Sequence, residues 1–386
     1  MNYTIKANKD PIVSICTTFF NAEKFINRLL ESCLNQTYKN VELVIVDDAS
    51  TDGSEEIIRK YMMRDSRITY FRNSERIGVS ESFLKMSMLA KGDFAMVLGA
   101  DDWLSKDYIK NGVRTFLAHP DAAGIVPKST NLRGVSDGKF KFISVILDKF
   151  FPPKTYLSEW FIKRIYKPTC LYVSGYALVR KNDLISAMDY YIKNYYHSPL
   201  TSVPEELRGF FKRALGIDSV LFTEILTRYK NFVFDSSLNY IKTEHSGNQT
   251  FDFGWGSATE IFKNAYYYLL IYKYIHKSLW SKFYRGAKIY LGAQMLSSAC
   301  IYFFKHGMRL SALNFKENKK FIYGFWKEFS FFDIILVAIY VFPMAMGRII
   351  NFITAKFMKW RGWTARPDSV FIKENFLDSE RCFKID

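Results

Sequence analysis

Two pairs of adjacent aspartates are the residues of this sequence best suited to chemistry. The pair Asp47–Asp48 follows the apolar run Val41–Val46, and the pair Asp101–Asp102 follows the apolar run Phe94–Gly99. Adjacent carboxylates repel each other, and they suit a hard divalent cation that keeps positions open for phosphate oxygens. Either carboxylate of the first pair could instead accept hydrogen bonds from a base N–H group or from ribose hydroxyls. Together the two pairs predict a site for a nucleoside diphosphate held through a metal ion.

Alternating strands and helices must bring the two pairs to one place. The sequence predicts strands at Ile12–Phe19, Val41–Val46, Arg67–Phe71 and Phe94–Gly99, with helices at Asn21–Leu34, Asp52–Met62 and Gly78–Ala90 between them. This alternation is typical of βαβ units and therefore of a parallel sheet in an α/β fold. In such a sheet, ligands bind beyond the carboxyl ends of the strands, so Thr17 and Phe19 should lie in the same crevice as the four carboxylates.

Beyond Asp102 the alternation is less regular. We predict, in chain order, a helix at Ser105–Ala118, a strand at Ala123–Pro127, an irregular loop at Lys128–Lys154, two strands within Thr169–Arg180, a helix at Leu215–Arg228 and an extended segment at Ser237–Lys242. The GxGxxG motif of a dinucleotide site does not follow the first predicted strand, and the GxxxxGK[ST] motif of a P-loop is also absent from the sequence.

Five segments together resemble family 2 glycosyltransferases of the GT-A fold. They are "VSICTTFFNAEKFI" (Val13–Ile26), "QTYKNVELVIVDDASTDGS" (Gln36–Ser54), "RIGVS" (Arg76–Ser80), "AKGDFAMVLGADDW" (Ala90–Trp103) and "GIDSVLFTEIL" (Gly216–Leu226). The resemblance covers about residues 10–250 and implies a Rossmann-like, mostly parallel sheet flanked by helices. It also implies an inverting enzyme that moves a sugar from a nucleotide-diphosphate sugar, UDP-linked, to a hydroxyl group of an acceptor.

The resemblance further implies roles for single residues. The Asp101–Asp102 pair matches the motif that binds Mg²⁺ or Mn²⁺, with Asp101 also near the ribose. Arg76 would either meet a phosphate or remain a solvated loop charge, and Trp103 should pack behind the pair. The residues expected to contact the nucleotide sugar are Thr17, Phe19, Asp47, Asp48, Arg76 and Asp101.

Two residues in the later part of the chain are candidates for the reaction itself. Asp218 matches the family's catalytic base, which takes the proton of the acceptor hydroxyl as it attacks the anomeric carbon. An acid at this position would also suit the first turn of a helix. His245 would either approach the metal or diphosphate or be an ordinary loop histidine.

The sequence departs from the family pattern at three positions. Gly99 stands where relatives commonly carry the first aspartate of an Asp-x-Asp-Asp motif, so the metal site should have one carboxylate fewer. Leu84 stands where relatives often place asparagine, and Ile217 precedes Asp218 where glutamate is more common.

The C-terminal part of the chain differs from the rest in charge. Residues 261–366 hold 17 Lys and Arg against three acidic residues, a balance of +14 out of +16 for the whole chain. The uncharged stretches Ile289–Phe304 and Ile334–Gly347 are shorter than the roughly 20 apolar residues of a spanning helix. We therefore predict a glycosyltransferase domain at 1–250, in which residues 10–127 bind the nucleotide sugar and residues 128–250 form the acceptor side. Residues 251–386 should form a helical, basic, aromatic-rich, membrane-associating region. This region would lie on or re-enter an anionic membrane surface. A kinked span starting near Phe329 or an ordinary helical subdomain are the alternatives.

These features predict a setting as well as a reaction. The basic region at 251–386 and the family resemblance predict a lipid-linked or nascent polysaccharide acceptor. The protein should lie at the cytoplasmic face of a bacterial inner membrane, as a peripheral or monotopic protein. The five scattered cysteines indicate reduced thiols, and the polar N-terminus shows no signal peptide. A non-catalytic nucleotide-sugar-binding protein is the main alternative. A sugar nucleotidyltransferase would need a Gly-rich loop after the first strand, and no nucleic-acid-binding module is recognisable.

Overall fold

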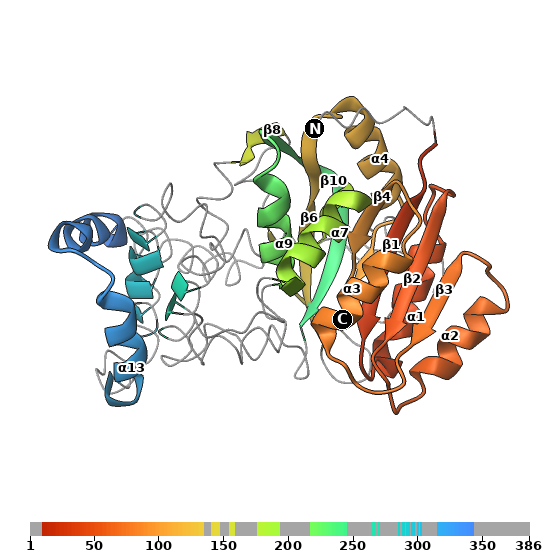
Figure 1. Ribbon diagram of the computed structural model, residues 1–386, viewed down its shortest axis with the longest axis horizontal. Coiled ribbons are helices and arrows are strands. Elements are labelled where there is room, and N and C mark those ends of the chain that lie inside the picture. Colours follow the sequence, from red (N-terminus) through yellow and green to blue (C-terminus); the bar gives the residue numbers. More distant parts are fainter. Residues whose placement is uncertain are drawn as a thin grey trace, which may run out of the picture. The chain divides into compact units, whose positions relative to one another are not determined.

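The computed structural model describes residues 10–134, 140–146, 154–158, 176–193, 217–244 and 315–342, with isolated helical positions between 262 and 302. The chain divides into two compact units, one containing the residues up to His245 and the other lying within Ser246–Arg366. Figure 1 shows the described residues and labels many of their helices and strands.

The first unit begins with the alternating elements that the sequence predicts. In chain order they are β1 (Val13–Phe19), α1 (Glu23–Leu34), β2 (Val41–Asp47), α2 (Ser54–Met62), β3 (Ile68–Arg72), α3 (Val79–Leu89) and β4 (Phe94–Val97). The four strands lie in the order β3-β2-β1-β4, and every neighbouring pair is parallel (Figure 1). The predicted parallel α/β sheet is therefore confirmed in this half.

The sheet continues with the later strands in a mixed arrangement. The elements are β5 (Trp103–Leu104), α4 (Tyr108–Ala118), β6 (Ala122–Gly134), β7 (Phe140–Ile146), β8 (Lys154–Leu157), β9 (Leu178–Arg180), α7 (Lys181–Tyr191), α9 (Ile217–Leu226) and β10 (Asn231–Glu244). Beyond β4 the order is β9-β6-β10-β5. Because β9 is antiparallel to both β4 and β6, and β10 is parallel to β6, the carboxyl end of β10 lies at the same edge as those of β1, β2 and β4.

The prediction of an irregular loop at Lys128–Lys154 is wrong for its described residues. Strand β6 continues to Gly134, and β7 pairs with it antiparallel, from Ser129 opposite Ile146 to Gly134 opposite Phe140. The segment Ser129–Gly134 has little apolar character, but its backbone bonds to β10 as well as β7. Pairing on both sides thus sets its conformation where side-chain propensity does not.

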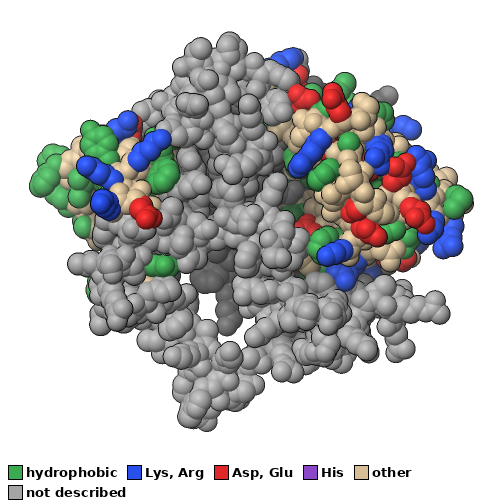
Figure 2. Space-filling view, turned by 90° about the horizontal axis from the view of Figure 1, so that it is seen from below, with side chains coloured by type: hydrophobic (Ala, Val, Ile, Leu, Met, Phe, Trp, Pro, Cys, Tyr) green, Lys and Arg blue, Asp and Glu red, His purple; other side chains and the backbone are tan. Residues whose placement is uncertain are grey.

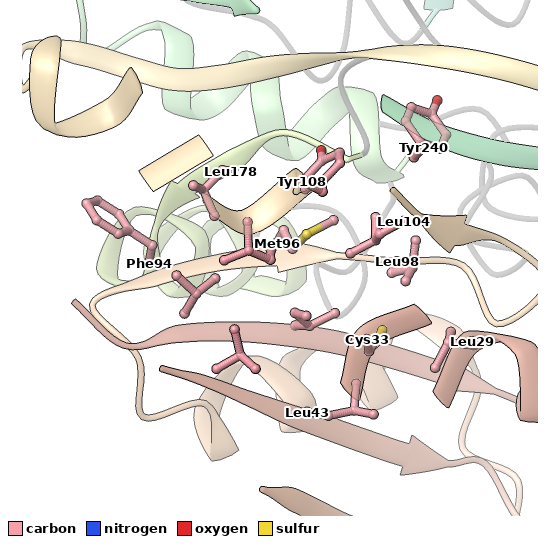
Figure 3. Close-up of a cluster of buried hydrophobic side chains, with 14 of the residues drawn as sticks. Leu29, Cys33, Leu43, Phe94, Met96, Leu98, Leu104, Tyr108, Leu178 and Tyr240 are labelled. Carbon is pink, nitrogen blue, oxygen red and sulfur yellow. The ribbon is translucent and has the colours of Figure 1, made fainter. Parts of the chain in front are cut away.

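The buried strand residues form two layers of core. On one face, Val13 and Ile15 of β1 and Leu43 of β2 join side chains of α1 and α4, including Leu29 and Tyr108 (Figure 3). On the other face, Cys16, Val44 and Val46 pack against Met86 of α3. A sheet covered on both faces leaves its strand ends as the natural places for polar, functional side chains.

The second unit is helical over its described residues. It contains α13 (Phe315–Trp326), a helix at 331–342 and helical positions between 262 and 302. Ile289, Ala293 and Val337 form the centre of its apolar cluster. Among the described residues, no helix has both the length and the apolar character needed to cross a membrane. Residues 343–347 of the uncharged stretch Ile334–Gly347 lie outside the described part.

Candidate active site at the carboxyl edge of the sheet

Asp47 ends β2 and is completely buried. Its Oδ1 accepts a hydrogen bond from the backbone N–H of Ser50 at 2.8 Å, and its Oδ2 accepts one from the Tyr70 hydroxyl at 2.8 Å. The guanidinium of Arg72 lies 3.8 Å from Oδ2. Burial and this carboxylate together raise the pKa of Tyr70 well above its usual range. Asp47 therefore fixes the turn after β2 and ties it to β3.

Asp48 organises the loop that enters α3. Its Oδ1 accepts hydrogen bonds from the Ile77 N–H (2.9 Å) and the Asn73 side-chain amide (3.0 Å), and its Oδ2 accepts one from the Gly78 N–H (3.0 Å). The next residue, Ala49, has a left-handed backbone with φ of 61°, an unusual conformation for alanine. Such backbone strain at a strand end often marks a functional site.

The residues at the end of β1 separate into core and crevice positions. Phe19 packs its ring into the apolar core, and its carbonyl accepts the Asp48 N–H at 2.9 Å, which joins the ends of β1 and β2. The Oγ1 atoms of Thr17 and Thr18 are buried, and neither has a hydrogen-bond partner among the described residues. Arg76 is exposed, with its guanidinium carbon 4.0 Å from the ring centroid of Phe20.

Asp102 lies between β4 and β5 and is 2% exposed. Its Oδ1 accepts the Thr243 N–H at 2.8 Å, at the carboxyl end of β10, and its Oδ2 accepts the hydroxyl of Tyr176, just before β9. The Thr243 hydroxyl also donates to the carbonyl oxygen of Asp101. Burial, and then the charge of Asp101, raise the pKa of Asp102 to about 8, although Lys242 opposes this. A carboxyl in that environment favours a bound positive charge.

Gly99 has a close-packed environment. A Cβ atom at this position would lie 2.9 Å from Asp101 Oδ1, 3.2 Å from Asp102 Oδ2 and 3.2 Å from the Tyr176 hydroxyl oxygen. Both aspartates and the tyrosine therefore occupy the space that a side chain at position 99 would need.

The donor set at this edge fits Mg²⁺ or Mn²⁺. Asp101 and Asp102 supply hard carboxylate oxygens, and burial and the charge of Asp101 raise the pKa of Asp102 even though Lys242 lies near enough to oppose the shift. The described residues contain no group of three or more His, Cys, Asp or Glu side chains that could enclose a metal. A cation here would keep positions open for diphosphate oxygens.

The remaining predicted residues are Asp218, His245 and Trp103. Asp218 is the second residue of α9, which begins at Ile217 and confirms the predicted helix. His245 falls outside the described residues, directly after β10 ends at Glu244. Trp103 is buried on β5, and the Arg28 guanidinium carbon lies 4.8 Å from its ring centroid.

Two residues that bind the aspartate pair were missed by sequence reasoning. Tyr176 belongs to no motif, and only the topology that runs β9 antiparallel to β4 brings it to Asp102. Thr243 directly follows the predicted extended segment Ser237–Lys242, and strand pairing across the mixed sheet brings it to Asp102. Leu84 lies within α3, a helix between the strands β3 and β4.

Comparison with known proteins finds a family match in the first part of the chain. Residues 14–178 match the model of glycosyl transferase family 2. An uncharacterized glycosyltransferase of Haemophilus influenzae is 35% identical over 107 residues, which are 28% of this chain and 43% of that protein. The abequosyltransferase RfbV of Salmonella typhimurium is 38% identical over 99 residues (25% of this chain, 30% of that protein).

A third relative has a more explicit name. The Escherichia coli protein WfaP, a UDP-Glc:alpha-D-GlcNAc-diphosphoundecaprenol beta-1,3-glucosyltransferase, is 36% identical over 102 residues (26% of this chain, 40% of that protein). The chain thus spans less than half the length of these relatives.

A solved structure of similar fold extends the comparison to the whole chain. Staphylococcus aureus TarS, residues 1–349 in complex with UDP-GlcNAc, superposes with a TM-score of 0.53 at 17% identity and covers 92% of this chain and 93% of that one. At this identity the likeness shows the fold alone. Together with the parallel sheet, it shows that the first unit has a GT-A-type fold, and the match to glycosyl transferase family 2 lies within this unit, at residues 14–178.

Proposed function

We propose that this protein is an inverting glycosyltransferase that moves a sugar from a nucleotide-diphosphate sugar, a UDP-sugar, to a hydroxyl group of an acceptor. The observation that carries the proposal is the buried Asp102 carboxylate beside Asp101, at the sheet edge where β1 and β2 also end. In a family 2 domain, that edge is where a nucleotide sugar would bind.

Asp101 and Asp102 would hold Mg²⁺ or Mn²⁺ against the diphosphate. The metal, when bound, neutralises the negative charge that develops on the leaving diphosphate. Thr243 and Tyr176 keep the Asp102 carboxylate in place through the hydrogen bonds described above. Thr17, Phe19, Asp47, Asp48 and Arg76 stay the predicted contacts of the nucleotide sugar, and His245 the predicted further contact of the metal or diphosphate.

Asp218 would act as the general base. It takes the proton of the acceptor hydroxyl while that oxygen bonds to the anomeric carbon, and the bond from this carbon to the diphosphate oxygen breaks on the opposite side. This single displacement inverts the configuration at the anomeric carbon. A carboxylate at the start of α9 suits the role, because acids are also favourable in the first turn of a helix.

The names of relatives support the choice of donor and acceptor. WfaP is named for UDP-glucose as donor and a diphosphoundecaprenol-linked sugar as acceptor. We infer a lipid-linked or nascent polysaccharide acceptor, with the nucleotide sugar bound by residues 10–127 and the acceptor by 128–250. Residues 251–386 would contact an anionic membrane surface at the cytoplasmic face of a bacterial inner membrane, which makes the protein peripheral or monotopic.

The variant Asp218→Asn tests the reaction. We expect kcat for sugar transfer to fall by about 10²- to 10⁴-fold, since a general base typically contributes that much. Binding of the UDP-sugar, measured by calorimetry with Mn²⁺ present, should be unchanged. Glu224→Gln, on the same helix, is the matched control and should transfer normally. Full transfer activity in Asp218→Asn would refute the assignment of Asp218 as the general base. If the unaltered chain bound the donor but transferred no sugar, the non-catalytic alternative would be favoured.

A further inference from the structure

The helix at 331–342 is fixed at its start by a reciprocal cap and an ion-pair cluster. The Ser330 N–H donates to Asp333 Oδ2 at 3.0 Å, and the Asp333 N–H donates to Ser330 Oγ at 3.3 Å. Lys288 Nζ lies 2.7 Å from Asp333 Oδ2, and Arg285 Nε lies 3.0 Å from Oδ1. Such a capping box sets where the helix begins and which way it points.

Only a narrow side of this helix is buried. One turn after Asp333, Val337 is 1% exposed and packs on Ile289 and Ala293. Gly292 makes this approach possible, because a Cβ atom there would lie 2.9 Å from Val337 Cγ2. The contacts therefore hold the helix along one stripe and leave its other sides outward.

The outward sides of the helix are almost entirely apolar. Phe331 is 74% exposed, Phe332 69% and Phe342 71%, and they belong to a contiguous apolar group, the feature that marks an interaction surface. We call the whole group the exposed apolar face; it comprises Phe331, Phe332, Ile334, Ile335, Ile339, Tyr340 and Phe342. Hydrophobic side chains of this unit also stand at the surface in Figure 2, with Lys and Arg side chains close by.

The charged residues around the exposed apolar face indicate which kind of partner would cover it. The only charged residue within 331–342 is Asp333, which is buried, whereas Lys316, Lys319, Lys320 and Lys327 on and after α13 are exposed. Apolar side chains flanked by lysines match an anionic lipid surface. A second copy of the chain is disfavoured, because both partners would bring the same basic segment of net charge +14.

We propose that the helix at 331–342 lies in the plane of an anionic lipid bilayer, with the exposed apolar face inserted below the head groups. The described residues 331–342 rise about 18 Å. Their contact with Ile289 and Ala293 through Val337, along one side only, suits a helix that lies in the surface with its other sides in lipid. The inference rests on the membrane contact in the proposed function and gives it a specific face.

The test compares one triple variant with one double variant, both made in the full chain. Phe331→Ser/Phe332→Ser/Phe342→Ser removes the largest side chains of the exposed apolar face. Met63→Ser/Met88→Ser removes exposed apolar side chains of the first unit, 79% and 69% exposed, as the matched control. We expect the triple variant to sediment with phosphatidylglycerol–phosphatidylcholine vesicles at least about tenfold more weakly, because it loses the apolar area of three phenylalanines. The control should bind as the unaltered chain does, and pure phosphatidylcholine should bind less.

A second readout locates the helix directly. In Phe342→Trp, lipids brominated in their tails should quench more fluorescence than in the unaltered chain, and in Met63→Trp they should not. Unchanged vesicle binding of the triple variant would overturn the inference. So would a dimer in sedimentation velocity that the triple variant abolishes while vesicle binding stays. Because UDP-sugar transfer is assayed separately, lost vesicle binding in the triple variant would uphold the inference even if no transfer were found.

Discussion

Gly99 and Tyr176 determine the geometry of the aspartate pair together. The missing side chain at position 99 leaves room for the Tyr176 hydroxyl, which donates to Asp102 Oδ2. Where relatives commonly have a further carboxylate, this site has a neutral hydrogen-bond donor close by. The departure from the family motif is therefore matched by a second residue, far away in the sequence, that stabilises the remaining carboxylate.

Tyr176→Phe should weaken metal binding without unfolding the site. The Asp102 carboxylate loses one hydrogen bond, and bonds to charged groups contribute about 1.5–3 kcal/mol. We expect about a tenfold higher Mn²⁺ concentration for half-maximal UDP binding, measured by calorimetry. Tyr70→Phe is the control, because it removes a hydroxyl from Asp47 instead; its Mn²⁺ dependence should be normal. An equal shift in both variants would show that the effect is not specific to the metal site.

At the level of elements, the sequence predicts best where side-chain periodicity and burial agree. Strands β1 and β2 are buried on both faces and are rich in β-branched residues, so their predicted positions agree closely with the structure. By contrast, β9 is three residues long and held by two neighbouring strands, and the helix α7 that follows it was not predicted. The side-chain pattern of α7 is weakly amphipathic, and packing against α3 and α9 stabilises this helix instead.

The candidate site divides in the same way. Asp47, Asp48, Asp101 and Asp102 could be found because each pair directly follows a strong apolar run. Tyr176 and Thr243 could not, since they reach Asp102 through pairings between residues more than 70 positions apart. Neighbourhood along the chain is visible in a sequence, whereas contact across a mixed sheet depends on strand order.

The cap of the helix at 331–342 should make the second unit sensitive to acid. Burial raises the pKa of Asp333, but hydrogen bonds from Lys288, Ser330 and Arg285 outweigh it and hold the pKa well below the usual range. A depressed pKa in the folded state contributes stability above the unfolded pKa, near 4, and this contribution is lost as pH falls further. Thermal unfolding of this unit should therefore become easier from about pH 4 downward. Asp333→Asn should be less stable at pH 7 and lack this trend, whereas Glu317→Gln on α13 should keep it.

At the scale of the whole molecule, two different kinds of surface belong to two compact units. The first unit holds the carboxylates of the candidate active site, and the second unit belongs to the segment that carries almost all of the net positive charge. Each unit has an apolar cluster of its own. In the proposed function, the carboxylates would hold a cation in the first unit, and the basic segment of the second unit would contact an anionic surface.

Because each unit has its own core, calorimetric unfolding of the full chain should show two transitions that respond to different changes. UDP with Mn²⁺ stabilises only the unit that binds it, by about 2.7 kcal/mol at a ligand concentration of 100 times Kd. We expect this ligand to raise the midpoint of one transition, and Asp333→Asn to lower the midpoint of the other. Asp102→Asn should abolish the ligand shift and leave the second transition in place. If the ligand and Asp333→Asn shifted the midpoint of the same transition, the two units would unfold together, which would contradict the prediction of two independent units.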